Sequence, residues 1–352
     1  MNLTQIDAWK QSLRADPPMA CRPPIWARSG HSHTLIAHLL PSPSPPGSGR
    51  HQRIALPDGD HLAAVYHPGS RPVLLYLFHG LGGSTASNYM HRIMTLAASR
   101  GFHTLAVNHR GCGFGEGLAA GPYHSGRSDD LGAAVAHGRR LHPEKIHIAI
   151  GFSLSGNALL LLAAEGESPR RPDLALAVNA PIALEQAARS LKHGFSRLYD
   201  WRFLLRCRQA VRSRYKHGLI KTRYRIPLFT TLHDFDNIYT APAGGFRDRE
   251  DYYQTCSAKF KLARAGIPTI LLTSKDDPMV DYRAYLAAEL SPFVHLHLED
   301  RGGHMGYLHH RPTPLGGHFW LDYAIDHFID RSLRTLFTPN GRDEEATRWP
   351  VP

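Results

Sequence analysis

The stretch Lys145-Ile-His-Ile-Ala-Ile-Gly-Phe-Ser153-Leu-Ser-Gly-Asn-Ala-Leu-Leu-Leu-Leu162 decides the fold. Its alternating and apolar residues up to Ile150 predict a buried strand, and the Leu- and Ala-rich run 157–165 predicts a helix. Ser153 lies between them, at the apex of a turn too short for an ordinary loop. Such a turn strains the backbone of its central residue and raises that side chain above the sheet, which is the nucleophile-elbow pattern. The helix start also directs the backbone N–H of Leu154 toward any negative charge that develops beside the Ser153 oxygen.

This turn departs from the usual G-x-S-x-G form of the pattern. Ser155 occupies the position of the last glycine, and Gly156 follows one step later. The glycine normally lets helix and strand approach closely, and serine is one of the smallest alternatives. Because Gly and Ser are common in loops, the five-residue pattern alone does not separate a catalytic serine from a structural turn. The rest of the chain has to decide.

Buried strands alternate with helices on both sides of this turn. Residues 52–56 and 61–67 predict an antiparallel hairpin around Asp58-Gly59. The remaining expected strands are 72–78, 103–108, 145–150, 174–179, 267–273 and 293–298. The expected helices are 88–100, 129–141, 157–165 and 315–336. This order is typical of an α/β protein with a mostly parallel sheet flanked by helices.

The alternation is interrupted between residues 183 and 265 by polar, basic, helical sequence. We expect this segment to form a lid over the carboxyl edge of the sheet. The Pro41-Ser-Pro-Ser-Pro-Pro46 run predicts a loop or extended linker. The expected organisation is a Pro-rich arm over 1–50, a core formed by 51–182 and 266–337, the lid insertion 183–265, and a polar, disordered tail over 338–352.

Composition limits the compartment and the class of site. The chain has 352 residues, 42% of them hydrophobic, and contains no run of 18 uncharged apolar residues, so we expect no membrane-spanning helix. Residues 1–18 lack the apolar region of a signal peptide. The four cysteines are scattered without CxxC spacing, which favours a reduced protein. We expect a cytoplasmic location, with peripheral association at the inner membrane as an alternative.

Positive charge is concentrated in the lid segment. Residues 183–226 hold twelve Lys and Arg side chains and two acids, which gives +10 of the chain's net +11. A solvated helical surface is the simplest interpretation, and attraction to anionic lipid headgroups or an acidic partner is the alternative. Nucleic-acid binding is not expected, because no recognised nucleic-acid motif accompanies the charge.

A nucleophilic serine requires a base, and the base requires an acid that orients it. Asp276 and Asp277 follow the strand that ends at Thr273, and His304 follows the strand that ends at Leu298. Loops at the carboxyl ends of parallel strands are where α/β proteins assemble their sites. The chain order Ser, Asp, His is that of the α/β-hydrolase fold. We therefore predict this fold, with a helical lid insertion.

The segment His79-Gly-Leu-Gly-Gly83 follows an early strand and supplies the remaining part of such a site. Its glycines allow the loop to turn close to a substrate carbonyl. We predict that the backbone N–H of Leu81 is the second oxyanion donor beside that of Leu154. Gly80 and Gly82 are predicted to contact the substrate.

At this point the chain resembles the YheT-like α/β-hydrolases, a family of bacterial predicted esterases and eukaryotic membrane-associated relatives. The resemblance spans nearly the whole chain and rests on several motifs. They are Arg22-Pro-Pro-Ile-Trp26, the His79 loop, Asn108-His-Arg-Gly-Cys-Gly113, Tyr123-His-Ser-Gly126, Tyr199-Asp-Trp-Arg-Phe203, Asp234-Phe-Asp-Asn237, Asp277-Pro278 and Gly303-His304.

The resemblance implies Ser153 as the nucleophile, His304 as the base and Asp277 as the orienting acid. Asp277 is preferred over Asp276 because the family pattern places the acid directly before the proline. Ser155 is the departure, since the family has glycine there. The apolar lid residues, which include Tyr199 and Phe203, are expected to contact a lipid-like or medium-chain acyl group.

The predicted activity is hydrolysis of short- to medium-chain or lipid-like esters by a serine carboxylic-ester hydrolase, with no cofactor. Two rivals remain at this stage: an acyltransferase on the same scaffold, and a catalytically silent protein that docks a membrane or partner through its basic lid. His31-x-His33 and His295-x-His297 have spacings that can hold a metal, but no matching Cys or carboxylate accompanies them, so no metal is expected.

Overall fold

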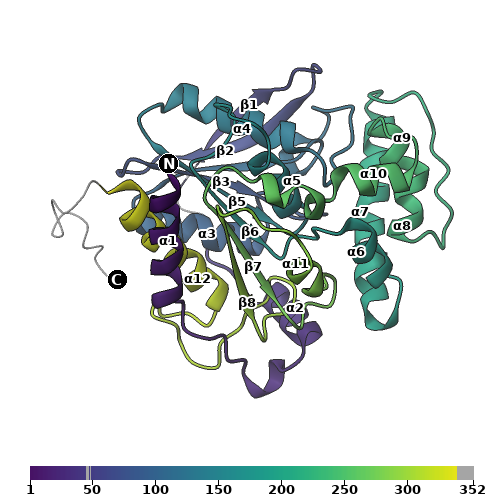
Figure 1. Ribbon diagram of the computed structural model, residues 1–352. Helices are drawn as coiled ribbons and strands as arrows, with labels where there is room; N and C mark the ends of the chain where they lie inside the picture. Colours follow the sequence, from purple (N-terminus) through teal and green to yellow (C-terminus); the bar gives the residue numbers. More distant parts are fainter. Residues whose placement is uncertain (45–46, 48, 339–352) are drawn as a thin grey trace.

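Eight strands form one mixed sheet in the computed structural model, which describes residues 1–44, 47 and 49–338 (Figure 1). The strand order is β1-β2-β4-β3-β5-β6-β7-β8. The strands are β1 Arg50–Ala55, β2 His61–His67, β3 Val73–Phe78, β4 His103–Asn108, β5 Ile146–Phe152, β6 Leu174–Val178, β7 Thr269–Ser274 and β8 Val294–Glu299. β1 and β2 form the expected antiparallel hairpin, and β3 to β8 pair in parallel.

The parallel strands are apolar throughout because helices cover both faces of the sheet. Along β3, Leu74, Tyr76 and Phe78 enter one core, whereas Val73, Leu75 and Leu77 enter the other. The first core includes residues of α4 and α5, and the second includes residues of α1, α3 and α12. The helices are α1 Leu3–Ala15, α3 Asn88–Ser99, α4 Ser128–Leu141, α5 Leu154–Ala163 and α12 Trp320–Ser332.

The α/β-hydrolase fold class is confirmed by this sheet and its flanking helices. The expected strands agree with the observed ones to within about two residues. The last helix begins at Trp320 rather than at residue 315, because residues 311–319 form turns that lead from a short bridge between Leu308 and Phe319.

The arm 1–50 is more structured than a Pro-rich segment suggests. Asn2 caps α1 through a capping box with Gln5, and Ile6, Trp9 and Leu13 bury one side of this helix against α12 and the turn after it. The sequence analysis missed α1 and also α2, Gly30–Leu39, which is capped by Ser29. Residues 45, 46 and 48, together with the predicted tail 339–352, lie outside the described residues.

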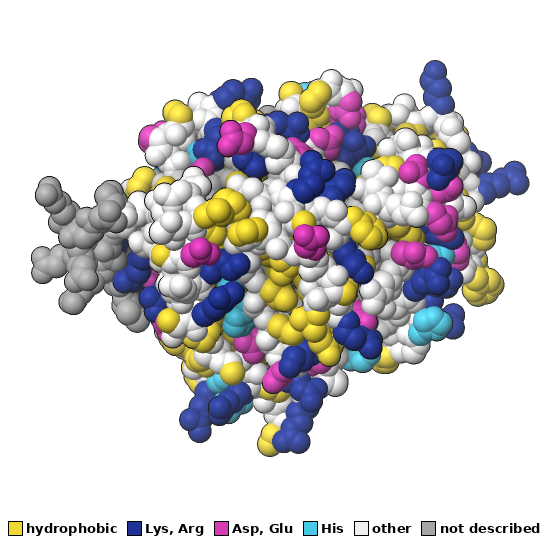
Figure 2. Space-filling view, viewed as in Figure 1, with side chains coloured by type: hydrophobic (Ala, Val, Ile, Leu, Met, Phe, Trp, Pro, Cys, Tyr) yellow, Lys and Arg dark blue, Asp and Glu magenta, His cyan; other side chains and the backbone are white. Residues whose placement is uncertain are grey.

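Helices of the segment 183–265 lie beside the carboxyl edge of the sheet, at the right of Figure 1. They are α6 Leu184–Ser190, α7 Arg197–Lys216, α8 Leu232–Phe235, α9 Ala241–Ala243 and α10 Arg249–Cys256. We call this segment the lid. Lys and Arg side chains project from it at the right of Figure 2. No helix within the described part of the chain has the length and apolar content needed to cross a bilayer.

Candidate active site

Ser153 joins β5 directly to α5 and has a strained backbone. Its φ of 52° and ψ of −117° lie in a region that L-residues rarely adopt. The Ser153 N–H donates to the Val178 carbonyl at 2.8 Å, and the Ser153 carbonyl accepts from the Gly156 N–H at 2.8 Å. These contacts hold the turn that the sequence predicted.

Gly151 and Gly156 provide the close approach of helix and sheet. A Cβ atom on Gly156 would lie 2.8 Å from the Ala180 Cβ, and one on Gly151 would lie 2.5 Å from the Ser155 carbonyl oxygen. Ser155 is fully buried, and its hydroxyl donates to the His79 carbonyl and contacts the His109 ring. Ser155 therefore joins the elbow to the His79 loop instead of crowding it.

His304 lies between Ser153 and Asp277. The His304 Nε2 is 2.8 Å from the Ser153 Oγ, and the His304 Nδ1 is 2.8 Å from Asp277 Oδ2. Asp277 also accepts the Met279 and Val280 backbone N–H groups on Oδ1, at 2.8 and 3.0 Å. A carboxylate held by these donors fixes the imidazole tautomer that has its proton on Nδ1.

Asp276, the rejected alternative, has a different position. Its Oδ1 accepts the N–H groups of Gly302 and Gly303, both at 2.9 Å, so it shapes the loop that carries His304. Asn179, at the end of β6, donates to Asp277 Oδ2 at 2.7 Å and to the Gly303 carbonyl at 3.2 Å. The structure thus separates an acid that contacts the histidine from one that supports its loop.

The N-terminal arm also supports the His304 loop. The His304 N–H donates to Thr34 Oγ1 on α2 at 2.9 Å. Gly30 has no room for a side chain, since a Cβ atom there would lie 1.7 Å from the Asp276 carbonyl oxygen. Helix α2 is therefore part of the framework of the site.

The His79 loop leaves one backbone N–H free beside Ser153. The Gly80 N–H donates to the Tyr89 hydroxyl at 2.9 Å, and the Gly82 N–H donates to the Tyr123 hydroxyl at 2.8 Å. The Leu81 N–H between them has no acceptor among the described residues, and Leu81 lines the cavity that contains Ser153. This arrangement favours the predicted donor role of Leu81.

Two buried histidines fix the base of this loop. His79 Nδ1 donates to the Gly80 carbonyl at 2.8 Å, and its Nε2 accepts the His109 backbone N–H at 3.2 Å. Burial lowers the pKa of His79 to about 4, and burial together with the nearby His79 ring lowers the pKa of His109. Both rings are therefore neutral at pH 7 and act as rigid hydrogen-bonding spacers.

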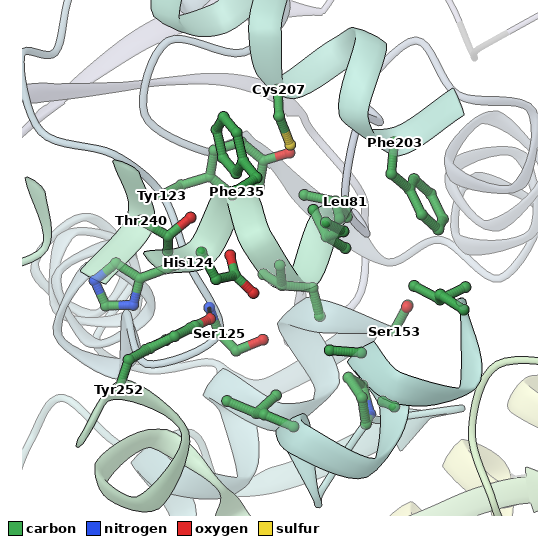
Figure 3. Close-up of a pocket in the computed structure, with 18 of the residues that line it drawn as sticks. Leu81, Tyr123, His124, Ser125, Ser153, Phe203, Cys207, Phe235, Thr240 and Tyr252 are labelled. Carbon is green, nitrogen blue, oxygen red and sulfur yellow. Dashed lines mark hydrogen bonds between the residues drawn. The ribbon is translucent and has the colours of Figure 1, made fainter. Parts of the chain in front are cut away.

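Two chambers meet at the catalytic candidates. Leu81, Ser153, Phe203, Met279 and His304 line both of them. The inner chamber lies between the sheet edge and the lid, and has an empty volume of about 940 Å³ with its mouth included. In Figure 3, Ser153 and Phe203 lie at one side of it, and Thr240, His124 and Tyr252 at the other.

The outer chamber lies between α2, α3 and α7. Several of its lining side chains are exposed, among them Leu198 at 44%, Trp201 at 60% and Leu205 at 39%. The inner chamber is lined mainly by buried apolar side chains such as Leu184, so the two chambers differ in how exposed their lining side chains are.

The predicted substrate-contacting residues all line a chamber. Gly80, Gly82 and Tyr199 line the outer one, and Phe203 lines both. The amides of both glycines are held by tyrosines, and the Tyr199 hydroxyl lies 3.2 Å from His31 Nδ1, so these residues offer shape more than free polar groups.

The sequence analysis assigned no role to several residues that position the predicted site residues through hydrogen bonds. Tyr89, Tyr123, Asn179 and Thr34 all contact the candidate residues or their loops. Asn179 is the last residue of the predicted strand 174–179, and a polar residue at the carboxyl end of an apolar strand was an available signal. Within the described residues, no group of three or more His, Cys, Asp or Glu side chains is placed to hold a metal ion.

Comparisons with known proteins identify the family to which the fold belongs. A model of the alpha/beta hydrolase fold family matches residues 73–310. A protein of Escherichia coli (strain K12) named "Putative esterase YheT" is 33% identical over 292 residues, which are 80% of this chain and 85% of that protein. The human protein named "Phospholipase ABHD3" is 26% identical over 81% of this chain and 73% of its own length.

Solved structures show the same fold. The esterase Pf2001 of Pyrococcus furiosus superposes with a TM-score of 0.54 at 16% identity, over 83% of this chain and 98% of that one. The family model and the 33% identical relative show that the chain belongs to the α/β-hydrolase family. Within that family it is a YheT-like member, and it is an esterase- or lipase-like hydrolase.

Proposed function

We propose that this protein is a serine carboxylic-ester hydrolase that uses Ser153, His304 and Asp277 and acts on lipid-like or medium-chain esters. The observation that carries the proposal is the hydrogen-bonded series from Ser153 Oγ through the His304 ring to Asp277, with 2.8 Å at each step. The strained Ser153 backbone and the free Leu81 N–H support it, because each is expected of a nucleophile elbow beside an oxyanion hole.

The Ser153 oxygen attacks the ester carbonyl carbon as its proton passes to His304 Nε2. The N–H groups of Leu81 and Leu154 stabilise the negative charge on the carbonyl oxygen. The bond to the alcohol oxygen then breaks, and His304 gives its proton to the leaving alcohol. A water molecule, deprotonated by the same ring, attacks the acyl-enzyme and restores Ser153 with release of the acid.

We propose that each of the two chambers holds one half of the ester. The alcohol has to depart before water reaches the acyl-enzyme, so we place it in the outer chamber, whose lining side chains are the more exposed. The acyl group remains bonded to Ser153 and occupies the inner chamber. Apolar side chains such as Leu184, Leu191 and Phe235 line that chamber, which supports an acyl chain of several carbons.

The peripheral partner of such an enzyme would be an anionic lipid surface. The exposed side chains Leu198, Trp201 and Leu205 of α7 line the outer chamber and lie among basic residues, and residues 201–216 include no acid. Apolar side chains with flanking arginines are typical of helices that bind at a bilayer interface. This partner is proposed from charge and exposure.

Labelling with a fluorophosphonate tests the proposed function without knowledge of the natural substrate. The wild-type protein should be labelled and should hydrolyse 4-nitrophenyl butyrate, and Ser153→Ala should lose both properties while it keeps its fold. Ser99→Ala, which changes an exposed serine at the end of α3, is the matched control and should retain both. Labelling or full turnover by Ser153→Ala would refute the assignment.

A further inference from the structure

The outer chamber has a charge pattern that an ordinary apolar alcohol does not require. Arg202 and Arg206 of α7 line it together with His38 of α2, and no Asp or Glu is among its described lining residues. The chamber also contains Ser153 and His304, so these cations are part of the cavity in which we placed the alcohol half of the ester.

Both arginines lack an acidic partner. Arg92, the third arginine of the chamber, is 2.8 Å from an Asp322 oxygen, whereas neither Arg202 nor Arg206 forms an ion pair with any described residue. Arg202 donates to His38 Nε2 instead. Partial burial, and then the charges of Arg202 and Arg206, lower the pKa of His38, so its ring stays neutral and accepts this bond.

Arg206 is fixed beside the His79 loop. Its stem packs over Gly82, where a Cβ atom would lie 3.2 Å from the Arg206 Cγ and 3.3 Å from its Cβ. Gly82 follows Leu81, the predicted oxyanion donor, so the Arg206 stem starts at the edge of the reaction centre. A side chain anchored at its stem has fewer positions for its guanidinium than one free in solvent.

We infer that the outer chamber binds an anionic group, a phosphate or a carboxylate, that is carried by the alcohol half of the ester. Guanidinium groups bind both anions through two parallel hydrogen bonds, and two exposed arginines that line one cavity without a carboxylate partner among the described residues can share such a ligand. Leu198, Trp201 and Leu205 border the same cavity, which suits an alcohol with an apolar part next to its charge. This inference rests on the proposed function and specifies its substrate.

The test compares three soluble butyrate esters whose alcohol halves are glycerol, glycerol 3-phosphate and glycerate. The wild-type kcat/KM should be at least about ten-fold higher for a charged ester than for the neutral one. Arg202→Gln and Arg206→Gln should each lower this charged-to-neutral ratio by about ten-fold, mainly through KM. Arg212→Gln removes an exposed charge from the same helix outside the chamber, and should keep the wild-type ratio.

Each outcome has a defined meaning. Preference for the phosphate ester alone assigns phosphate, and preference for both charged esters assigns a general anion site. A wild-type charged-to-neutral ratio near one would overturn the inference, and so would a ratio that Arg206→Gln and Arg212→Gln lower equally. In either case, hydrolysis of the neutral ester would still support the proposed function.

A binding measurement covers the case in which no ester is turned over. Calorimetric titration of the Ser153→Ala protein with glycerol 3-phosphate should show binding that Arg206→Gln weakens by about ten-fold and Arg212→Gln leaves intact. Absence of binding, or equal binding by both variants, would also overturn the inference. This readout does not depend on catalysis, so it separates failure of the anion site from failure of the proposed activity.

Discussion

Replacing Tyr123 by Phe tests whether the oxyanion hole is held open by its neighbours. The Tyr123 ring stacks on His109 at 5.2 Å with an interplanar angle of 4°, and Phe keeps this packing. The substitution removes only the hydroxyl, which accepts the Gly82 N–H at 2.8 Å and also contacts the Cys112 thiol. The Leu81 N–H then lies next to an amide that is no longer fixed.

The expected magnitude follows from that one lost acceptor. A buried N–H without a partner costs ~1–3 kcal/mol, and because the Gly82 N–H is only part-buried we expect a loss of unfolding free energy at the lower end of this range. Loss of a whole oxyanion donor costs ~2.7–4 kcal/mol in activation free energy. Loosening the adjacent residue should cost a fraction of that, so kcat should fall by about ten-fold, or roughly 1.4 kcal/mol, with little change in KM.

Steady-state hydrolysis of 4-nitrophenyl butyrate and urea denaturation measure the two effects. Tyr66→Phe is the matched control, because its hydroxyl is 2.6 Å from Nδ1 of His103. His103 begins β4, whereas the His79 loop follows the opposite, carboxyl end of the parallel strand β3. Tyr66→Phe should lose stability but keep kcat. If Tyr123→Phe shows the predicted loss of unfolding free energy but keeps the wild-type kcat, the hydrogen bond between Tyr123 and the Gly82 N–H has no catalytic role.

Three further predictions concern other parts of the chain. Ser155→Gly should lower the unfolding free energy by about 1–2 kcal/mol and lower kcat, because it removes a buried hydrogen bond and introduces a glycine into α5. A higher kcat would show that the Ser155 side chain distorts the turn at Ser153. Burial, followed by the charge of Arg127, lowers the pKa of His124 from 6.5 to about 3, so the folded state binds fewer protons than the unfolded state in this range, and stability falls as the pH drops from 6.5 toward 3. His124→Asn removes the titrating imidazole, and the Asn side chain can still accept the Gly126 N–H. In urea titrations, this variant should therefore show a flatter dependence of unfolding free energy on pH, by at most about 1.4 kcal/mol per pH unit. An unchanged dependence would contradict the pKa shift. The double variant Trp201→Ser, Leu205→Ser should reduce flotation with anionic vesicles about ten-fold or more, because burying such side chains contributes roughly 1.5–3 kcal/mol each. Leu286→Ser, which changes another exposed leucine, is the control. If the wild-type protein shows no salt-sensitive flotation, the membrane partner is excluded.

The strands and the order of Ser153, Asp277 and His304 could be predicted from the sequence because each depends on local pattern. Buried parallel strands are continuous apolar runs, and the loops that follow them meet at one edge of the sheet. The sequence could not show that Ser155 points at the His79 carbonyl, 76 residues earlier in the chain. In the linear pattern the same serine looks only like an intrusion.

The tyrosine hydroxyls that accept the Gly80 and Gly82 N–H groups could not be predicted from the sequence either, because the Tyr123 hydroxyl binds an amide 41 residues away. Helix α1 was missed for another reason. Ile6, Trp9 and Leu13 have helical spacing behind an Asn2 cap, but the proline pairs that follow dominated the interpretation of the arm. The apolar face of α1 is buried only by packing against α12, which lies more than 300 residues later in the chain.

The contacts of the arm have a consequence for the order in which the protein matures. Trp9 Nε1 donates to Ser332 Oγ, 323 residues away, and Thr34 receives the His304 N–H across 270 residues. During synthesis the first two helices leave the ribosome long before their binding surfaces exist. The catalytic histidine candidate can be fixed only after the far end of the sheet has been made, so contacts of such long range make folding slow and couple the onset of activity to nearly the whole chain.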